Sequence, residues 1–195
     1  MALVGANGCG NSTLLGIMAG AVRPDGGQIL YGGEEPFKNK KLFNKYTGYV
    51  PQENPLLSEL SVYDNLKFWY CDSGRDLEQD MKDGVLHEFG LDVYRNYQVQ
   101  KLSGGMKKRL SIACALAANP PILIMDEPGA ALDIVCKEDI KRYLKGYLSG
   151  GGTVMITSHE ESELAICDRM LLLKDGTVSE LSDVPTGAEL LKYLK

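Results

Sequence analysis

The sequence of 195 residues lacks the features of several protein classes. Its five cysteines are odd in number and show no C-x-x-C spacing, so we expect neither a disulfide framework nor a zinc site. No apolar run approaches the ~18 to 20 residues that cross a bilayer, and the N-terminus lacks the charged-then-apolar order of a signal peptide. We therefore expect a reducing cytoplasmic location, where any membrane span comes from another chain.

An excess of positive charge is also missing. The chain has 21 lysines and arginines against 26 aspartates and glutamates, a net charge of -5, which tells against a general nucleic-acid binder. The lysines at positions 38, 40, 41 and 45 are expected to form a solvated face rather than a nucleic-acid or lipid patch. The length suits one domain with one sizeable core.

The first fifty residues predict alternating strands and helices. The apolar run "MALVG" ends in glycine, and "STLLGIMAG" has the apolar spacing of a helix that Gly20 closes. "GQILYGG" (27–33) alternates like a strand, and "YTGYVPQ" (46–52) predicts another strand that Pro51 stops.

Helical patterns dominate from about residue 61 to residue 105. "SVYDNLKFWY" opens with Ser61 and Asp64 in a capping-box arrangement, and 77–91 carries apolar residues at helical spacing. The aromatic cluster at 68–70 has two interpretations, helix core or partner contact, and clustered aromatics favour the core.

The second half predicts a mostly parallel sheet. A helix over 103–119 is followed by two buried strands, "PILIMDEP" and "TVMITSH". "RMLLLKDGTVSEL" (169–181) predicts a hairpin that turns on Asp175-Gly176, and "TGAELLKYLK" (186–195) a terminal helix. Strands alternating with helices predict an α/β sandwich whose chemistry lies at the carboxyl ends of its strands.

The stretch "GANGCGNST" nearly matches the phosphate-binding pattern G-x-x-x-x-G-K-[ST]. Gly5, Gly8 and Gly10 let backbone N–H groups converge on phosphates at a helix N-terminus. Asn11 stands where the pattern has lysine. Alone, the stretch could also be a glycine-rich turn between a strand and a helix.

The stretch "LIMDEP" places two carboxylates at the end of a buried strand. Asp126 can reach a magnesium ion that bridges phosphates, and Glu127 can polarise a water molecule. The alternative is that both carboxylates merely end a strand in solvent.

Further motifs carry a resemblance to a family. "YVPQ" with Gln52, "LSGGMKKRLSIA" from Leu102, "PGAALD" and "TSHE" with His159 follow in order along the chain. The whole chain resembles the ATP-binding-cassette (ABC) family of ATPase domains. The resemblance implies a P-loop NTPase α/β fold, an ABC-type sandwich with a core at 1–52 and 106–195 and a helical subdomain with the signature at 53–105.

The resemblance also implies roles for individual residues. Glu127 resembles the base for the attacking water and His159 the contact to the terminal phosphate, although a lone histidine is often a satisfied core residue. Gln52 resembles a residue that completes the metal and water shell. The implied magnesium ligands are Ser12, Gln52 and Asp126. The residues implied to bind ATP are Gly5, Asn7, Gly8, Cys9, Gly10, Asn11, Ser12, Thr13, Ser103, Gly104, Gly105 and Asp133.

Partners follow from the same resemblance. Ser103, Gly104 and Gly105 begin a helix and form an anion site that, in this family, faces the nucleotide of the opposite subunit. The working unit is then a homo- or heterodimer of cassettes on the inner face of the cell membrane. A transmembrane permease subunit would dock between segment 53–60 and the helical subdomain, with "YQVQK" (97–101) on the rim. Met106 in "LSGGM" resembles exporter-type cassettes.

Two departures from the family pattern concern nucleotide binding. Asn11 carries no charge, so we expect ATP binding to weaken ~10- to 100-fold and hydrolysis to suffer more. Family members place about two strands, with an adenine-stacking aromatic, before the strand "MALVG", so we expect an incomplete antiparallel subsheet. Two explanations stay open, a truncated or mutated active subunit and a silent cassette that lends its signature to a partner. The soluble cassettes of DNA repair or translation fit less well, since no coiled-coil insert or second cassette is present.

Overall fold

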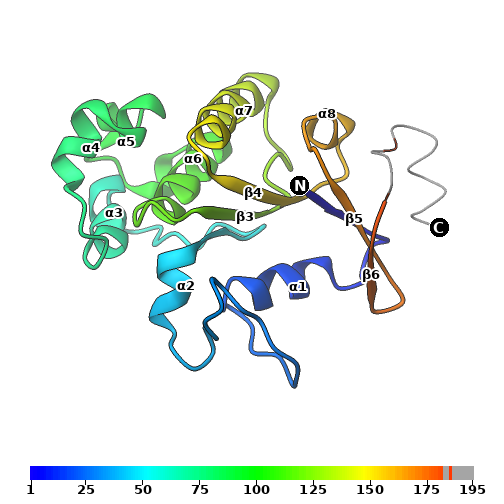
Figure 1. Cartoon of the computed structure of the whole chain (residues 1–195). Coiled ribbons are helices and arrows are strands. Elements are labelled where there is room, and N and C mark those ends of the chain that lie inside the picture. Colours follow the sequence, from blue (N-terminus) through cyan, green and yellow to red (C-terminus); the bar gives the residue numbers. More distant parts are fainter. Residues whose placement is uncertain (182–184, 186–195) are drawn as a thin grey trace.

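The structure, a computed structural model, describes residues 1–181 and residue 185. Its centre is one sheet with the strand order β2-β3-β4-β1-β5-β6 (Figure 1). The strands are β1 (Ala2–Val4), β2 (Thr47–Val50), β3 (Ile122–Asp126), β4 (Thr153–Thr157), β5 (Met170–Lys174) and β6 (Thr177–Glu180). All neighbours pair in parallel except β5 and β6. The expected α/β sandwich with a mostly parallel sheet is confirmed.

The strands that form the centre of the sheet are apolar on both faces. In β1, Ala2 and Val4 belong to one buried cluster, while Leu3 between them belongs to the other. The same alternation runs through β3, where Leu123 and Met125 face one side and Ile124 the other. A strand whose two faces are both covered has no polar side to show, which explains the continuous apolar runs in the sequence.

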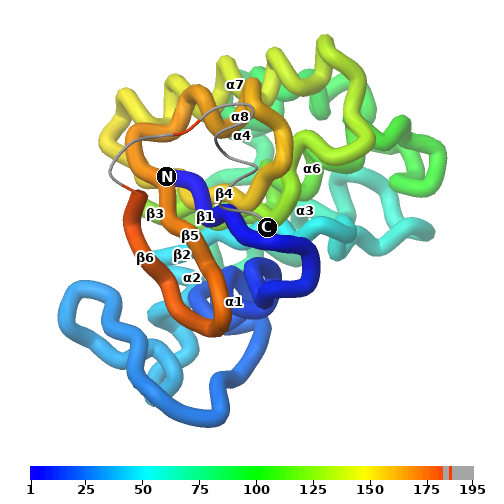
Figure 2. The backbone as a smooth tube through the Cα atoms, turned by 90° about the vertical axis from the view of Figure 1, so that its right-hand side faces the viewer, coloured from blue at the N-terminus to red at the C-terminus, as the bar shows by residue number. Residues whose placement is uncertain are grey.

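Helices cover the two faces of the sheet. In Figure 1, α1 (Asn11–Met18) and α2 (Lys41–Tyr46) lie on one face, while α6 (Gly104–Ala115) and α7 (Ile134–Ser149) lie on the other. The view in Figure 2 shows β1 beside β5, although the two strands lie far apart in the sequence. The chain thus builds the two-layer cover that a parallel sheet requires.

A group of short helices lies at one end of the sheet (Figure 1). It contains α3 (Val62–Tyr70), α4 (Leu77–Asp83), α5 (Val85–Glu88) and the 3-10 turns η1 (Asp92–Tyr94) and η2 (Val99–Lys101). Ser61 caps α3 as expected, because its hydroxyl accepts a hydrogen bond from the Asp64 amide at 3.0 Å. A further short helix, α8 (Glu161–Leu164), follows β4. The division of the chain into a core and a helical subdomain remains a prediction.

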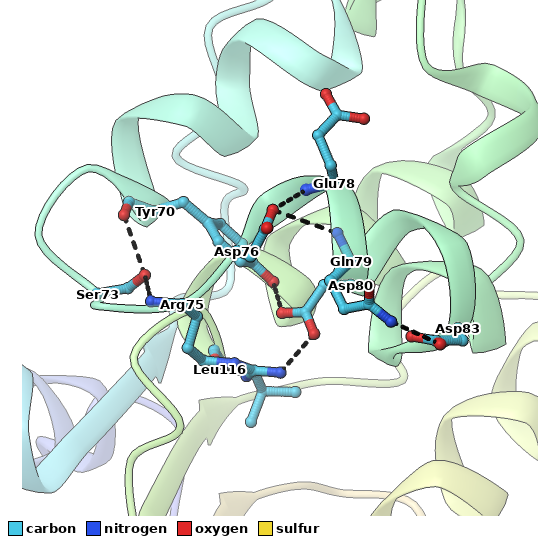
Figure 3. A network of polar contacts seen from close by, with 9 residues as sticks. All are labelled: Tyr70, Ser73, Arg75, Asp76, Glu78, Gln79, Asp80, Asp83 and Leu116. Atoms are coloured by element: carbon cyan, nitrogen blue, oxygen red, sulfur yellow. Dashed lines mark hydrogen bonds and ion pairs between the residues drawn. The ribbon is translucent and has the colours of Figure 1, made fainter.

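A polar network ties the helical group to α6 (Figure 3). Arg75 donates to Asp80 Oδ1 at 2.7 Å and to the carbonyl oxygen of Leu116, the C-cap residue of α6, at 3.3 Å. The hydroxyl of the buried Tyr70 donates to Asp80 Oδ2 at 2.6 Å. These contacts satisfy a buried carboxylate and one of the free carbonyls at a helix end.

Three expectations about secondary structure can be compared with the structure. "GQILYGG" is not a strand: within the described residues it makes one isolated bridge, Tyr31 to Glu34. Gly27, Gly32 and Gly33 have positive φ angles, which interrupt an extended backbone. The hairpin at Asp175-Gly176 is confirmed by the pairing of β5 with β6. The terminal helix expected at 186–195 lies outside the described residues.

The aromatic cluster is only partly in the core. Tyr70 is buried, but the core expectation is wrong for Phe68 and Trp69, which are 65% and 42% exposed. The buried positions of α3 are Val62, Asn65, Leu66 and Tyr70, which recur every three or four residues along one side of the helix. Residues 68 and 69 therefore lie off the buried stripe of this short helix.

Candidate active site

The carboxyl ends of four parallel strands meet at one edge of the sheet. Strand β1 leads to the glycine loop, β2 to Gln52, β3 to Asp126 and Glu127, and β4 to His159. These segments line one open pocket, formed by Ala6, Asn7, Gly8, Gly10, Asn11, Ser12, Thr13, Gln52, Asp126, Glu127, Thr157 and His159. The fold thus brings together most of the residues that the sequence predicted for the site.

The glycine loop has the geometry of an anion-binding turn. Gly8 and Gly10 adopt positive φ angles of 79° and 110°, which residues with a Cβ rarely tolerate. The Cys9 amide closes a turn onto the Ala6 carbonyl oxygen at 3.0 Å. Gly10 precedes α1 without a side-chain cap, so the amides of the first turn stay available to an anion.

Two predicted loop residues, Gly5 and Cys9, do not appear among the described residues that line the pocket. A Cβ placed on Gly5 would lie 2.5 Å from Cys9 Sγ and 2.6 Å from the carbonyl oxygen of Leu173, so only glycine fits there. Cys9 packs against the buried cluster around Leu3.

Asn11 lines the pocket at the position of the missing lysine. Its Oδ1 atom is buried and has no hydrogen-bond partner within the described residues. This oxygen also lies 3.3 Å from the position of a Cβ on Gly5. No lysine or arginine of the described chain lines the pocket. The pocket wall therefore lacks the positive charge that the loop pattern normally supplies.

Thr157 joins the two carboxylate positions and was missed by the sequence reasoning. Its hydroxyl donates to Asp126 Oδ1 at 2.5 Å and accepts from the Glu127 amide at 3.1 Å. Asp126 is only 3% exposed, so this hydrogen bond satisfies a buried carboxylate. Asp126 and Thr157 are directly paired in the register of β3 and β4. The runs "LIMD" and "VMIT" mark both residues as strand ends, but the register that pairs them is not visible in the sequence.

Glu127 and His159 form a contact across the pocket. His159 Nε2 lies 3.3 Å from Glu127 Oε1. Burial raises the pKa of Glu127, the charge of His159 partly offsets that rise, and the neighbouring Asp126 adds to it. Glu127 also has a φ of 48°, a left-handed conformation that is uncommon outside glycine. The carboxylate is thus held in place with a raised proton affinity, as suits a base.

The other predicted residues lie outside this pocket. Ser103 caps α6 by accepting from the Met106 amide at 3.2 Å, and Asp133 caps α7 by accepting from the Cys136 amide at 2.8 Å. A Cβ on Gly105 would lie 2.8 Å from Cys136 Sγ, so the two helix N-termini are neighbours. Ser103, Gly104, Gly105 and Asp133 do not appear among the described lining residues.

The pocket fits a magnesium-bound phosphate chain. The loop amides and the N-terminus of α1 suit anionic oxygens, and the Ser12 hydroxyl and the Asp126 carboxylate are the oxygen ligands that magnesium prefers. In the described part of the chain, no group of three or more His, Cys, Asp or Glu side chains could hold a metal ion. The oxygen atoms that this pocket would offer a magnesium ion are those of the Ser12 hydroxyl, the Gln52 amide and the Asp126 carboxylate.

A second hollow lies among the end of α1, α2, β2, the end of α6 and the helical group. Its walls include Pro51 and Pro55 and, from the helical group, Phe68 and Trp69. Of segment 53–60, which was expected to form one side of the permease groove, only Pro55 is among the described lining residues. Segment 97–101, expected on the rim, does not appear among the described lining residues. It pairs instead with 58–62, where the Val99 amide donates to the Leu60 carbonyl oxygen at 2.9 Å. No helix among residues 1–181 has both the length and the apolar composition needed to span a bilayer.

Comparisons with known proteins give a consistent result. Residues 1–130 match the family model described as ABC transporter. The lipopolysaccharide export system ATP-binding protein LptB of Haemophilus influenzae is 35% identical over 185 residues, covering 90% of this chain and 76% of LptB. The spermidine/putrescine import ATP-binding protein PotA of Mycoplasma mycoides is 32% identical over 92% of this chain, and the chain spans about half of PotA, 52% of its length.

A solved structure is similar in both fold and sequence. The dimeric post-hydrolysis state of the ATP-binding cassette MJ0796, bound to ADP and Pi, superposes with a TM-score of 0.80 at 27% identity. The match covers 93% of this chain and 85% of that one.

Proposed function

The chain belongs to the ABC transporter family, and on that premise we propose that it is a subunit that binds Mg-ATP and hydrolyses it to drive transport through a permease. The observation that carries the proposal is the convergence of Gln52, Asp126, Glu127 and His159 on a glycine loop at the N-terminus of α1. The similarity to LptB and MJ0796 supports the same class of activity.

Each pocket residue has a defined task in this proposal. When bound, Mg-ATP supplies the phosphoanhydride whose terminal phosphoryl group is transferred to water. The loop amides from Gly8 to Thr13 and the dipole of α1 hold the phosphates. Ser12, Gln52 and Asp126 would hold the magnesium ion, and Thr157 fixes the orientation of the Asp126 carboxylate.

Glu127 acts as the base for the attacking water. Burial raises its pKa, so the carboxylate takes up a proton more readily than an exposed glutamate does. His159, at 3.3 Å, orients this carboxylate and reaches toward the terminal phosphate position. Because phosphoryl transfer depends mostly on positioning and electrostatics, these two side chains set the rate together.

Asn11 impairs both binding and hydrolysis in this proposal. A lysine would contribute a charge-assisted hydrogen bond worth ~1.5 to 3 kcal/mol, or about 10- to 100-fold in affinity. Asn11 can donate a hydrogen bond but carries no charge, and its buried Oδ1 is unpaired in the described structure. The protein should therefore bind Mg-ATP weakly and turn it over slowly.

The signature residues act on the nucleotide of a second cassette. Ser103, Gly104 and Gly105 start α6, next to the Asp133 cap of α7, away from this chain's own pocket. The MJ0796 structure is dimeric, which supports a closed pair of cassettes as the working unit. Whether the second cassette is another copy of this chain or a different one, the same helix N-terminus provides the anion site.

The hollow beside Trp69 is the proposed contact for the permease. Its walls expose Phe68 and Trp69, apolar side chains that a cytoplasmic segment of a permease could cover. The chain would then lie on the cytoplasmic side of the membrane. Met106 resembles the residue of exporter-type cassettes, and the similar proteins include both LptB, named for export, and PotA, named for import.

A silent cassette is the second candidate, and Asn11 is the observation that favours it. Such a subunit would lend its intact signature, Ser103 to Gly105, to a competent partner and hydrolyse nothing itself. The two candidates differ in nucleotide titration and turnover of the chain alone and then with a partner cassette. An impaired ATPase binds and slowly hydrolyses Mg-ATP alone, whereas a silent cassette hydrolyses none alone and raises the turnover of its partner.

The proposed function is tested with the double variant Asn11→Lys/Glu127→Gln. The lysine restores binding, while glutamine keeps the shape of glutamate but cannot accept the proton of water. We expect this variant to bind Mg-ATP without hydrolysing it and to elute as a dimer in gel filtration with Mg-ATP. The control is Asn11→Lys alone, which should release phosphate. A variant that binds ATP tightly and stays monomeric at high concentration contradicts the paired-cassette mechanism for this chain.

A further inference from the structure

Lys108 is a buried lysine with no part in the mechanism above. It lies on α6, five residues after the Ser103 cap, and is only 4% exposed. Its ammonium group donates to two backbone carbonyl oxygens, those of Pro51 and Gln52, at 3.3 Å each. The contact therefore joins the helix that carries the signature to the segment that carries Gln52.

The helix that bears Lys108 is fixed against β2, the strand before Gln52. Gly48 of β2 approaches α6 so closely that a Cβ there would overlap the carbonyl oxygen of Ala115. Strand β2 ends at Val50, so the backbone turns into the pocket directly after this contact. Lys108 holds the first two residues beyond the strand and extends the fixed region up to Gln52.

Placing a lysine here is costly, so its presence needs an explanation. Lysines are rarely buried unless they are paired, and an apolar side chain would fill the same space at lower desolvation cost. Burial lowers the pKa of Lys108, while the carboxylates of Asp126 and Glu163 act in the opposite direction. The hydrogen bonds to the loop are the direct contacts that compensate the burial.

We propose that Lys108 is a positioning residue that ties Gln52 to the signature helix, so that the cassette's own pocket and its signature move as one unit. The tether acts on the backbone of Gln52, which leaves the Gln52 side chain free to line the pocket. Its role in catalysis rests on the proposed function, but the tether itself can be tested without nucleotide.

Backbone ¹⁵N relaxation of the full chain without nucleotide tests the tether. The probes are the amides of Gln52 and Glu53, which follow the two tethered carbonyls. Lys108→Met keeps the length of the side chain and removes the donor, so we expect the order parameters of these two amides to fall from about 0.85, the value of rigid backbone, to below about 0.6, with α6 and β2 unchanged. Lys108→Arg keeps donors and charge and should keep the order parameters close to those of the parent protein. Lys107→Met, the same change at the half-buried neighbour on α6, should match the parent protein.

The tether is overturned if Lys108→Met leaves the order parameters of the two amides at the parent values. It is equally overturned if the order parameters fall evenly over α6 and β2, since Lys108 would then be a general core residue. Should Lys108→Met fail to fold, Lys108→Gln, which is too short to reach both carbonyl oxygens, replaces it in the same comparison.

A kinetic measurement separates the tether from the proposed function. In an Asn11→Lys background, Lys108→Met should lower kcat at least ~10-fold while KM for Mg-ATP stays within about threefold, because the pocket is intact but Gln52 is less well placed. Equal kcat values contradict the catalytic part of the proposal. If Asn11→Lys neither binds nor hydrolyses Mg-ATP, the proposed function fails, while the relaxation result still decides on the tether.

Discussion

The imidazole of His159 lies 3.3 Å from the carboxylate of Glu127 across the pocket. The two residues follow different strands, β4 and β3, and meet because the parallel strands end at the same edge of the sheet. Burial raises the pKa of Glu127 and the charge of His159 opposes that rise. The contact between these two side chains therefore affects the proton affinity of Glu127, the proposed base.

The pH profile of hydrolysis should report the raised pKa of Glu127. Only the ionised carboxylate can accept a proton from water, so kcat in the Asn11→Lys variant should rise with pH along a limb above the ordinary glutamate range. Removing the charge of His159 takes away an influence that lowers the pKa of Glu127. His159→Ala should therefore lower kcat and move the limb to higher pH. A limb that stays in place or moves to lower pH contradicts this coupling.

The hydrogen bond between Thr157 and Asp126 should stabilise the fold. Thr157→Val keeps the shape of the side chain but removes the donor at 2.5 Å from a buried carboxylate. We expect the free energy of unfolding to fall by ~1.5 to 3 kcal/mol, the usual value for a hydrogen bond to a charged group. Urea denaturation measures the loss. Thr153→Val, at the exposed start of the same strand, is the matched control and should change stability by less than ~0.5 kcal/mol. Equal effects at both positions would show that the hydroxyl contributes nothing specific.

Two glycines should respond to alanine in opposite ways. A Cβ on Gly48 would overlap the carbonyl oxygen of Ala115, so Gly48→Ala should destabilise the protein by ~1 to 3 kcal/mol. Gly146 lies within α7 with nothing within 4 Å of a Cβ, so Gly146→Ala should stabilise it by ~0.4 to 1 kcal/mol. Thermal unfolding of both variants checks the signs. If Gly48→Ala leaves stability unchanged, α6 does not pack against β2 as closely as described. The contact between α6 and β2 next to the Lys108 hydrogen bonds would then be wrong as well.

The sequence predicts the site residues that follow the parallel strands, but not the residues that pair with them or pack beside them. Gln52, Asp126 and His159 each follow an apolar run, and in a parallel sheet the residues after such runs must meet. Strand pairing itself is not visible in one sequence, which is why Thr157, the partner of Asp126 in the register, was missed. Lys108 lies within "LSGGMKKRLSIA", but its burial depends on how α6 packs against its neighbours, which the sequence does not show.

Helix orientation is the other limit of the sequence analysis. Phe68 and Trp69 are residue types common in cores, yet the stripe that α3 buries consists of Val62, Asn65, Leu66 and Tyr70. A helix of nine residues has one buried stripe, and which aromatics fall on it depends on where the helix packs. The strand prediction for "GQILYGG" was wrong for a related reason. Tyr31 is buried because it stacks on Tyr46, and not because it pairs in a sheet.

The central claim is that the pocket binds Mg-ATP and is weakened by the charge missing at Asn11. Equilibrium titration with Mg-ATP, comparing the parent protein with Asn11→Lys, tests it most directly. We expect the lysine to raise affinity ~10- to 100-fold, as one charge-assisted hydrogen bond to phosphate implies. Asn96→Lys, the same change at an exposed site that does not line the pocket in the described structure, should leave affinity unchanged. Equal affinities for the parent and Asn11→Lys, or no binding by either, would contradict the account.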